Sequence, residues 1–349
     1  MIRIPAFVLV SVFSFQLGLS PAVLAGTPVT TAPWQELVVS VSDIDRTALF
    51  FKTLGGYRVL DSGQLSRSEI SAWGLTSAAS ATYSLIGPKD AESGLIRLVD
   101  FDNAGKQVPM RPGARAWDTG CFFSVMVRVK EIESLYSEAI DLGWWTETPI
   151  ASLQFGSSDL RIVIFKGPDG LQVQGYERLS PALPTEVGPF EQMSKPFNVM
   201  QMVADHGAAY RFLTEGLGFD TFYTGPPVTA PYPTISPIGI PESLATKVGY
   251  QAGIVFPVAG EYGRMEVIQL HGLKGQDYRD QCRAPNLGIL AVRFPVDDIK
   301  PVAERLQRFG AEVVTLRQVE WPQSELVDIV ETRSPDGAII QFYAKQTPK

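Results

Sequence analysis

The sequence predicts an α+β fold built from four βαβββ modules. Two observations carry this prediction: the second half of the chain repeats the first, and each repeat begins with an alternating apolar strand followed by a helix that ends at glycine. In addition, a hydrophobic fraction of 45% over 349 residues is typical of a globular protein with ordinary cores.

The repeat is clearest at two turns with the sequence Pro-Asp-Gly. Pro335 lies 167 residues after Pro168 (335 − 168), and the same shift places Gln341 over Gln174. A second pair of segments matches at a slightly smaller offset. Matching segments in this order indicate a duplicated unit that itself holds two related modules.

Each module has the same local pattern. An acidic or polar residue follows the first strand and favours the helix N-terminus, and the Gly of a Leu-Gly or Phe-Gly pair suits the left-handed C-cap. Further β-rich segments follow. We expect modules near residues 34–105, 119–179, 196–273 and 286–346, paired consecutively into domains over 34–179 and 196–346, with 180–195 as a proline-containing linker.

Residues 1–25 have the features of a secretory signal peptide. Arg3 precedes an apolar run, and Val23 and Ala25 supply the small residues at the cleavage site. We expect cleavage after Ala25, a periplasmic or secreted mature chain, and no membrane span afterwards, because no other apolar stretch is long enough. An uncleaved membrane anchor is the alternative.

The charge and the two cysteines limit partners and covalent links. A net charge of −7 without a basic run argues against nucleic-acid binding. Cys121 and Cys282 do not occupy equivalent positions in the two halves. We therefore expect two buried free thiols, with a disulfide as the alternative that export allows. The sequence predicts no particular oligomeric state.

The order of these elements resembles the vicinal oxygen chelate superfamily, which includes glyoxalases, bleomycin-resistance proteins and dioxygenases. The resemblance rests on Val-x-Asp after the first strand, an aromatic helix ending in Leu-Gly, and Pro-Asp-Gly before the last strand, and it covers residues 34–345. It implies two tandem glyoxalase-like domains, each with a cup-shaped sheet that takes a small molecule. Such a fold does not fix the function.

In metal-using members of that superfamily, ligands come from the first and last strands of each module. The corresponding first-strand positions here are Glu36, Ser124, Asn198 and Ala291, and the last-strand positions are Gln174 and Gln341, with Asp100 and Gln269 aligned without a turn to guide them. Transition metals favour His, carboxylate or thiolate donors. We therefore predict no cofactor and no metal in the second half; Glu36 and Asp100 are weak candidates for a divalent cation in the first.

Charged residues on inward strand faces are the other candidates. Strand alternation places Arg128 and Arg293 there, where they either pair with a carboxylate such as Glu36 or bind an anionic ligand group. His271, just after a strand, is a candidate general base, with an edge or loop position as the alternative. Glu36, Arg128 and His271 would thus be the catalytic residues of a metal-free enzyme.

Two segments are expected to border a pocket. Residues 111–118 contain Arg115 and Trp117, and residues 222–253 form a long proline-rich loop of the kind that often covers a site. We expect the pocket in the first half, through Glu36, Arg128 and Gln174; the alternative is a methionine-rich cup in the second half. The predicted ligand-binding set is Glu36, Ser124, Arg128, Gln174, Arg115, Trp117, Asn198, Arg293 and Gln341.

These observations predict an exported protein that binds a small organic molecule in a cup-shaped pocket without the usual metal. One alternative is a lyase, isomerase or dioxygenase that acts on vicinal oxygens, which by the usual route of that superfamily needs a metal as Lewis acid. A further alternative is a protein-interaction module.

Overall fold

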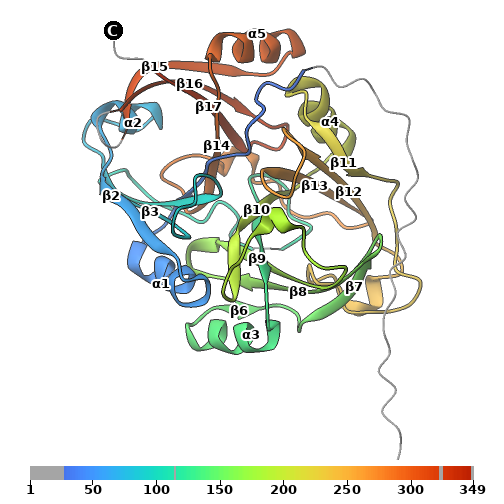
Figure 1. Ribbon diagram of the computed structural model, residues 1–349. Coiled ribbons are helices and arrows are strands. Elements are labelled where there is room, and N and C mark those ends of the chain that lie inside the picture. Colours follow the sequence, from blue (N-terminus) through green and yellow to red (C-terminus); the bar gives the residue numbers. More distant parts are fainter. Residues whose placement is uncertain (1–26, 114, 322–324, 347–349) are drawn as a thin grey trace, which may run out of the picture.

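The computed structural model describes residues 27–113, 115–321 and 325–346, so the predicted signal peptide lies outside the described residues. Two large curled sheets form the centre of the molecule, and helices lie around the outside (Figure 1). The predicted mixed α+β architecture is confirmed. No helix within the described ranges is long and apolar enough to cross a membrane.

The first sheet is made by the beginning and the end of the chain. In spatial order its strands are β15 (Val313–Trp321), β16 (Glu325–Arg333), β17 (Ile339–Lys345), β14 (Gly288–Pro295), β1 (Glu36–Ser40), β4 (Leu95–Asp102), β3 (Ser80–Gly87) and β2 (Arg58–Gln64).

The second sheet is made by the middle of the chain. In spatial order its strands are β11 (Asp220–Thr224), β12 (Gly249–Phe256), β13 (Arg264–His271), β10 (Met193–Met202), β5 (Ser124–Val129), β9 (Gln172–Ser180), β8 (Ser158–Lys166) and β6 (Trp145–Thr146), and β7 (Ala151–Phe155) also pairs with β8.

The helices connect strands within modules. They are α1 (Ile44–Gly55), α2 (Arg67–Ala72), α3 (Ile132–Asp141), α4 (His206–Arg211) and α5 (Ile299–Phe309), with shorter turns η1 (Pro168–Gly170), η2 (Thr185–Val187), η3 (Phe212–Gly216), η4 (Glu242–Leu244) and η5 (Arg279–Gln281). Asp43, Asp205 and Asp298 cap α1, α4 and α5 by accepting a backbone N–H.

The pairing of modules differs from the prediction. The first module pairs with the fourth through antiparallel β1 and β14, and the second pairs with the third through β5 and β10. The domains expected over 34–179 and 196–346 therefore do not correspond to the two sheets. A short connection from β9 to β10, residues 181–192, places the second module beside the third and leaves the outer two modules to pair with each other.

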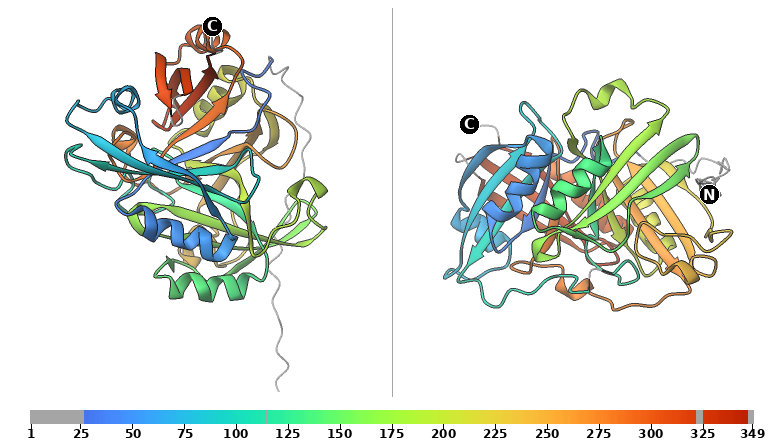
Figure 2. Two further views of the ribbon diagram at one scale, coloured as in Figure 1. Left: turned by 60° about the vertical axis from the view of Figure 1, so that its left-hand side comes forward. Right: turned by 90° about the horizontal axis from the view of Figure 1, so that it is seen from below.

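The central strands of each sheet are buried on both faces. One face of each contributes to a shared core, in which α1 and α3 lie side by side (Figure 2) and Phe50 of α1 stacks on Trp144 at a ring-centroid distance of 3.8 Å. The other face of each sheet lines a concavity of its own. We call these the first cup, on the first sheet, and the second cup, on the second sheet.

The two Pro-Asp-Gly turns fasten the sheets to each other. Asp169 in the second module accepts a hydrogen bond from the backbone N–H of Ser42 at 2.8 Å, and Asp336 in the fourth accepts one from Ala204 at 2.8 Å. Asp169 and Asp336 occupy matching positions in the two halves of the chain, and so do Ser42 and Ala204. The turns that reveal the duplication therefore also link the two sheets.

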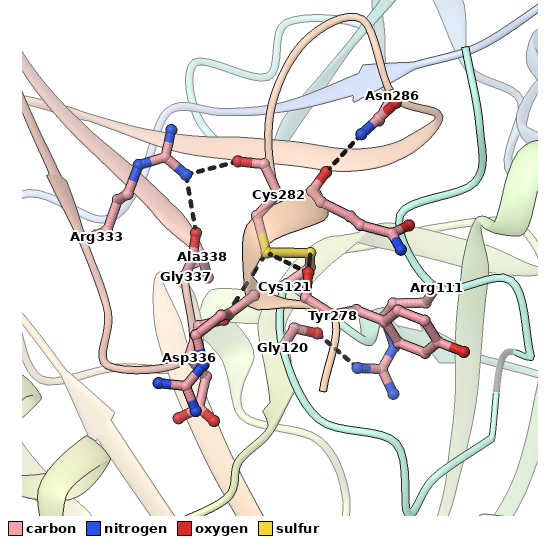
Figure 3. The surroundings of a disulfide bond; sticks show 12 residues. Arg111, Gly120, Cys121, Tyr278, Cys282, Asn286, Arg333, Asp336, Gly337 and Ala338 are labelled. Carbon is pink, nitrogen blue, oxygen red and sulfur yellow. Dashed lines mark hydrogen bonds between the residues drawn. A yellow bond between two sulfur atoms is a disulfide. The ribbon is translucent and has the colours of Figure 1, made fainter. Parts of the chain in front are cut away.

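A disulfide also joins the sheets. Cys121 lies just before β5 of the second sheet, and Cys282 lies before β14 of the first. Their Cα atoms are 5.2 Å apart and their sulfurs are bonded (Figure 3). The expectation of two free thiols is therefore wrong. Positions that are not equivalent in the repeat can meet because the second and fourth modules belong to different sheets that face each other at this point.

Candidate functional site

The first cup is filled by its own charged side chains. Glu36 of β1, which is only 4% exposed, accepts hydrogen bonds from Arg97 Nη2 at 2.8 Å and from Arg293 Nη1 at 2.7 Å. Arg293 also donates to Glu69 at 3.0 Å and to Gln341 at 2.8 Å. Each ionised group thus has at least one partner of opposite charge or a polar partner.

Electrostatics in the first cup favour this closed network. Burial raises the pKa of Glu36, but the charges of Arg97 and Arg293 and their hydrogen bonds outweigh burial and lower the pKa to about 2. The guanidinium of Arg293 also lies over the rings of Trp73 and Trp321. Together with α2, which packs against β15, these groups occupy the concavity.

The second cup holds a cavity of about 420 Å³. Its floor comes from the inward residues of β5, β9, β10 and β13, and the loop from β11 to β12, predicted as a lid, forms one wall. Most of the lining is apolar, including Met126, Leu160, Ile162, Phe197, Met200, Ile238, Ile240, Val248 and Ala252.

Four polar side chains meet at the centre of this cup, at the positions that hold metals in the resembling superfamily. Gln174 Nε2 donates to Ser124 Oγ at 2.5 Å, and Asn198 Nδ2 donates to Glu266 Oε2 at 2.9 Å. Tyr250 donates to the other oxygen of Glu266 at 3.4 Å. Asn198 Oδ1 is buried and accepts no hydrogen bond from any described residue.

Among the described residues, Glu266 is the one carboxyl group at this centre. Burial raises its pKa to about 7, and the hydrogen bonds from Asn198 and Tyr250 and the charge of Arg264 offset burial only in part. Glu266 therefore changes its protonation state near neutral pH, in contrast to Glu36 of the first cup.

The four central groups do not fit a divalent transition metal. Asn198 and Gln174 turn their N–H₂ groups toward Glu266 and Ser124, and the set offers a single carboxylate and no imidazole. Within residues 27–113, 115–321 and 325–346, no three His, Cys, Asp or Glu side chains are grouped as metal ligands.

Two of the predicted last-strand positions were aligned incorrectly. In the second module, Gln174 lies opposite Met126, two residues after the first-strand position Ser124. The equivalent residues are Val38 in the first module and Met200 in the third. Strand register places Arg97 opposite Val38 and Glu266 opposite Met200. Asp100 and Gln269 lie three residues further along, on the opposite face of their strands. Gln269 there binds backbone groups at the start of α4, and Asp100 lines a shallow depression beside Asp43 and Asp45.

The predicted pocket joined residues that the structure separates. Glu36 lies in the first cup, with Arg293 and Gln341, whereas Arg128 and Gln174 line the second cup with Ser124 and Asn198 nearby. The alternative, a methionine-rich cup, describes the cavity better, although β5 and β9 of the first half contribute half of its floor.

The remaining candidates lie outside the cavity. His271, the last residue of β13, contacts Gln251 at 2.8 Å, and no described residue of segment 111–118 lines the cavity. Arg115 forms an ion pair with Asp118, while Trp117 packs at the margin of the second-cup core.

Three further groups, not predicted from the sequence, line the cavity. Glu266, Arg178 and Tyr250 all face it. A carboxylate inside the mostly apolar stretch Met265–Leu270 was a signal for Glu266, because an isolated charge in a buried strand is usually paired or functional.

No protein-family model matches the sequence, and no curated protein matches it. Solved structures are similar to it. Glyoxalase I from Zea mays has a TM-score of 0.59 at 14% identity, covering 89% of this chain and 92% of that chain. A single-residue variant of that enzyme gives 0.60 at 14% identity, with the same coverage. A proposed dioxygenase from Bacillus subtilis gives 0.53 at 11% identity, covering 91% and 86%.

Identities this low establish the fold alone. The structures cover both repeats of the chain, so the resemblance inferred from the sequence is confirmed as a shared tandem glyoxalase-like fold.

Proposed function

We propose that this protein binds a small organic molecule in the second cup without using a metal. The observation that carries the proposal is the cavity of about 420 Å³, whose apolar walls surround a few convergent polar groups. Pockets for small molecules have this size and composition. Among the described residues, the first cup is instead occupied by its own ion pairs, which supports the second cup as the ligand site.

The polar centre supports metal-free binding. Gln174 donates a hydrogen bond to Ser124, and Asn198 donates one to Glu266. The buried Asn198 Oδ1 lacks a donor among the described residues, and a buried acceptor without a donor is unfavourable. A ligand N–H or O–H group would supply that donor and fix the orientation of an otherwise apolar molecule.

We also propose that the chain is exported to the periplasm or secreted. The signal-like segment 1–25 motivates this proposal, and the Cys121–Cys282 disulfide is consistent with an oxidising compartment. N-terminal sequencing of the mature protein tests it; a chain that still begins at Met1 would contradict it.

The binding proposal is tested by filling the cavity. Ala252 lines the second cup on β12, so Ala252→Trp should abolish ligand-induced thermal shifts in a small-molecule screen, whereas Ala78→Trp on an exposed loop should keep them. The shifts should persist in excess chelator. A shift that requires a divalent ion, or that survives Ala252→Trp, would contradict metal-free binding in this cup.

Glu266 supports a second candidate function, catalysis without a metal. A buried carboxyl group with a pKa of about 7, next to a cavity, has the properties of a general base or acid at neutral pH. It replaces Glu36 and His271 in that role. A panel of hydroxy-ketones and keto-acids in deuterated water, followed by NMR, tests this function: Glu266→Gln should stop any deuterium incorporation. Incorporation that continues in Glu266→Gln would exclude this base.

A further inference from the structure

We infer that the ligand of the second cup is an organic acid, with an apolar body and one anionic headgroup that binds Arg178. This inference rests on the proposed binding function and adds the chemical class of the ligand.

Arg178 faces the cavity without a partner for its charge. Every second side chain of β9 faces the cup, namely those of Gln174, Tyr176 and Arg178. No carboxylate among the described residues forms an ion pair with Arg178, and its Nε is buried without a hydrogen-bond partner. A half-buried guanidinium in this state lacks the acceptor that such groups normally have.

Two other arginines line the same cavity and share one carboxylate. Arg128 Nε donates to Glu261 at 2.6 Å, and Arg264 Nη2 lies 3.2 Å from the other oxygen of Glu261. Each guanidinium is also stacked on an aromatic ring, Arg128 on Phe197 and Arg264 on Phe222. The guanidinium groups of Arg128 and Arg264 are therefore held in place, and several of their N–H donors already have an acceptor within the protein.

The three arginines lie toward one end of the cup. Tyr176, two residues before Arg178, is the register partner of Arg128. The pKa of Arg178 is lowered by burial and then by the charge of Arg128, and Glu261 offsets only part of this effect. Among the described residues, Glu261 is the carboxylate that pairs directly with Arg128 and Arg264, which leaves the Arg178 guanidinium without an ion-pair partner next to an apolar cavity.

An anionic headgroup is the ligand chemistry that this arrangement favours. Guanidinium groups present planar donors that match a carboxylate or sulfonate, and charge-assisted hydrogen bonds of this type are about twice as strong as neutral ones. The apolar remainder of the ligand would lie against Met126, Phe197 and Met200. A neutral molecule of the same shape would leave Arg178 unpaired.

Two fluorescent dyes that differ only in an anionic group test this inference. Phenylnaphthylamine is neutral, and anilinonaphthalene sulfonate carries one sulfonate on the same scaffold. Both are titrated into the full-length mature chain and into Arg178→Met. A second variant, Arg58→Met, removes the same charge from an exposed position on β2 of the other sheet. Circular dichroism and thermal unfolding confirm that each variant is folded.

We expect Arg178→Met to weaken binding of the sulfonate dye by about tenfold or more, the loss of one charge-assisted contact, and that of the neutral dye by less than about twofold. Arg58→Met should change neither. Decanoate should displace the sulfonate dye from the unmodified chain more effectively than decanol does, and this difference should vanish in Arg178→Met.

Contrary results separate the two proposals. The organic-acid inference would be overturned, with binding in the cup left intact, by any of three results. Arg178→Met could weaken binding of both dyes equally, or weaken binding of neither. Alternatively, Arg58→Met could weaken binding of the sulfonate dye as much as Arg178→Met does. If neither dye and neither decanoate nor decanol binds the unmodified chain, the proposed function falls and the inference falls with it.

Discussion

Glu36 and Arg293 lie opposite each other in the register of β1 and β14, and their side chains are joined at 2.7 Å although 257 residues separate them in the chain. This contact spans the junction between the first and fourth modules. Both side chains are almost fully buried, and Arg293 is only 1% exposed. The ion pair that joins the two ends of the chain therefore also closes the first cup.

Removing the carboxylate of this pair should be costly. Glu36→Gln leaves Arg97 and Arg293 as buried cations without their shared partner, and we expect the free energy of unfolding to fall by about 3–5 kcal/mol. Urea denaturation at neutral pH measures this change. Ligand or dye binding in the second cup should remain intact in the folded variant.

Lys345→Met provides the matched comparison. It breaks an exposed ion pair with Glu325 in the same sheet and should lower the unfolding free energy by no more than about 1 kcal/mol. If Glu36→Gln proves no more destabilising than Lys345→Met, the first cup is not held together by its ion pairs.

The pairing of modules could not be predicted from the repeat. The duplication identifies four similar units, and each presents a first strand whose edge is free to pair with another first strand. Local patterns are the same whichever units combine. The choice depends on the short connection between β9 and β10 and on long-range contacts such as Glu36 with Arg293. Neither contributes to hydrophobic periodicity.

The last-strand positions inside the cups were predictable only where a turn fixed the register. Gln174 and Gln341 follow Pro-Asp-Gly turns, and both face a cup as predicted. The first and third modules lack that turn, and the alignment there slipped by three residues. Because side chains alternate along a strand, an odd slip moves the selected residue to the opposite face. Asp100 and Gln269 were therefore selected instead of Arg97 and Glu266.

The disulfide should contribute strongly to stability. It closes a loop with a sequence separation of 161, for which chain-entropy arguments give about 5 kcal/mol, and native disulfides typically contribute 2–5 kcal/mol. We expect Cys121→Ser combined with Cys282→Ser to lower the free energy of unfolding by about 2–5 kcal/mol in urea denaturation. Thiol titration of the denatured, unreduced protein should find no free thiol; two reactive thiols would contradict the bond.

Glu266 should make the fold less stable as the pH rises toward neutrality. Its pKa of about 7 lies above the ordinary value of 4.5, so the folded state binds this proton more tightly than the unfolded state does. The resulting stability is fully present below about pH 4.5 and is lost as the pH rises to about 7. The shift corresponds to about 3 kcal/mol.

Glu266→Gln isolates this contribution. The variant should be more stable than the unmodified chain at pH 8, and the difference should disappear near pH 4.5. Asp336, whose pKa burial raises to about 6, adds a similar slope that should persist in Glu266→Gln. Unfolding free energies from urea denaturation across this pH range provide the measurement. Parallel curves for the two proteins would show that Glu266 does not titrate in this window.

Binding of an anion in the second cup should depend on the same proton. The groups that face Glu266 are Asn198 from β10, Tyr250 from β12, Tyr176 from β9 and Arg264 from its own strand. Burial holds the pKa of Tyr176 and of Tyr250 above 10, and Arg264 stays protonated, so Glu266 is the group among them that changes charge between pH 5.5 and 8. When ionised, it repels an anionic ligand.

Anilinonaphthalene sulfonate keeps its charge throughout that range, so any pH dependence of its binding arises from the protein. We expect its affinity to rise by about three- to tenfold as the pH falls from 8 to 5.5, because protonation of Glu266 removes a like charge from the cavity. Glu266→Gln should bind the dye with the higher affinity at both pH values, and phenylnaphthylamine should show no such change. An equally steep pH profile in Glu266→Gln would assign the effect to another group and would separate Glu266 from the anion-binding end of the cup.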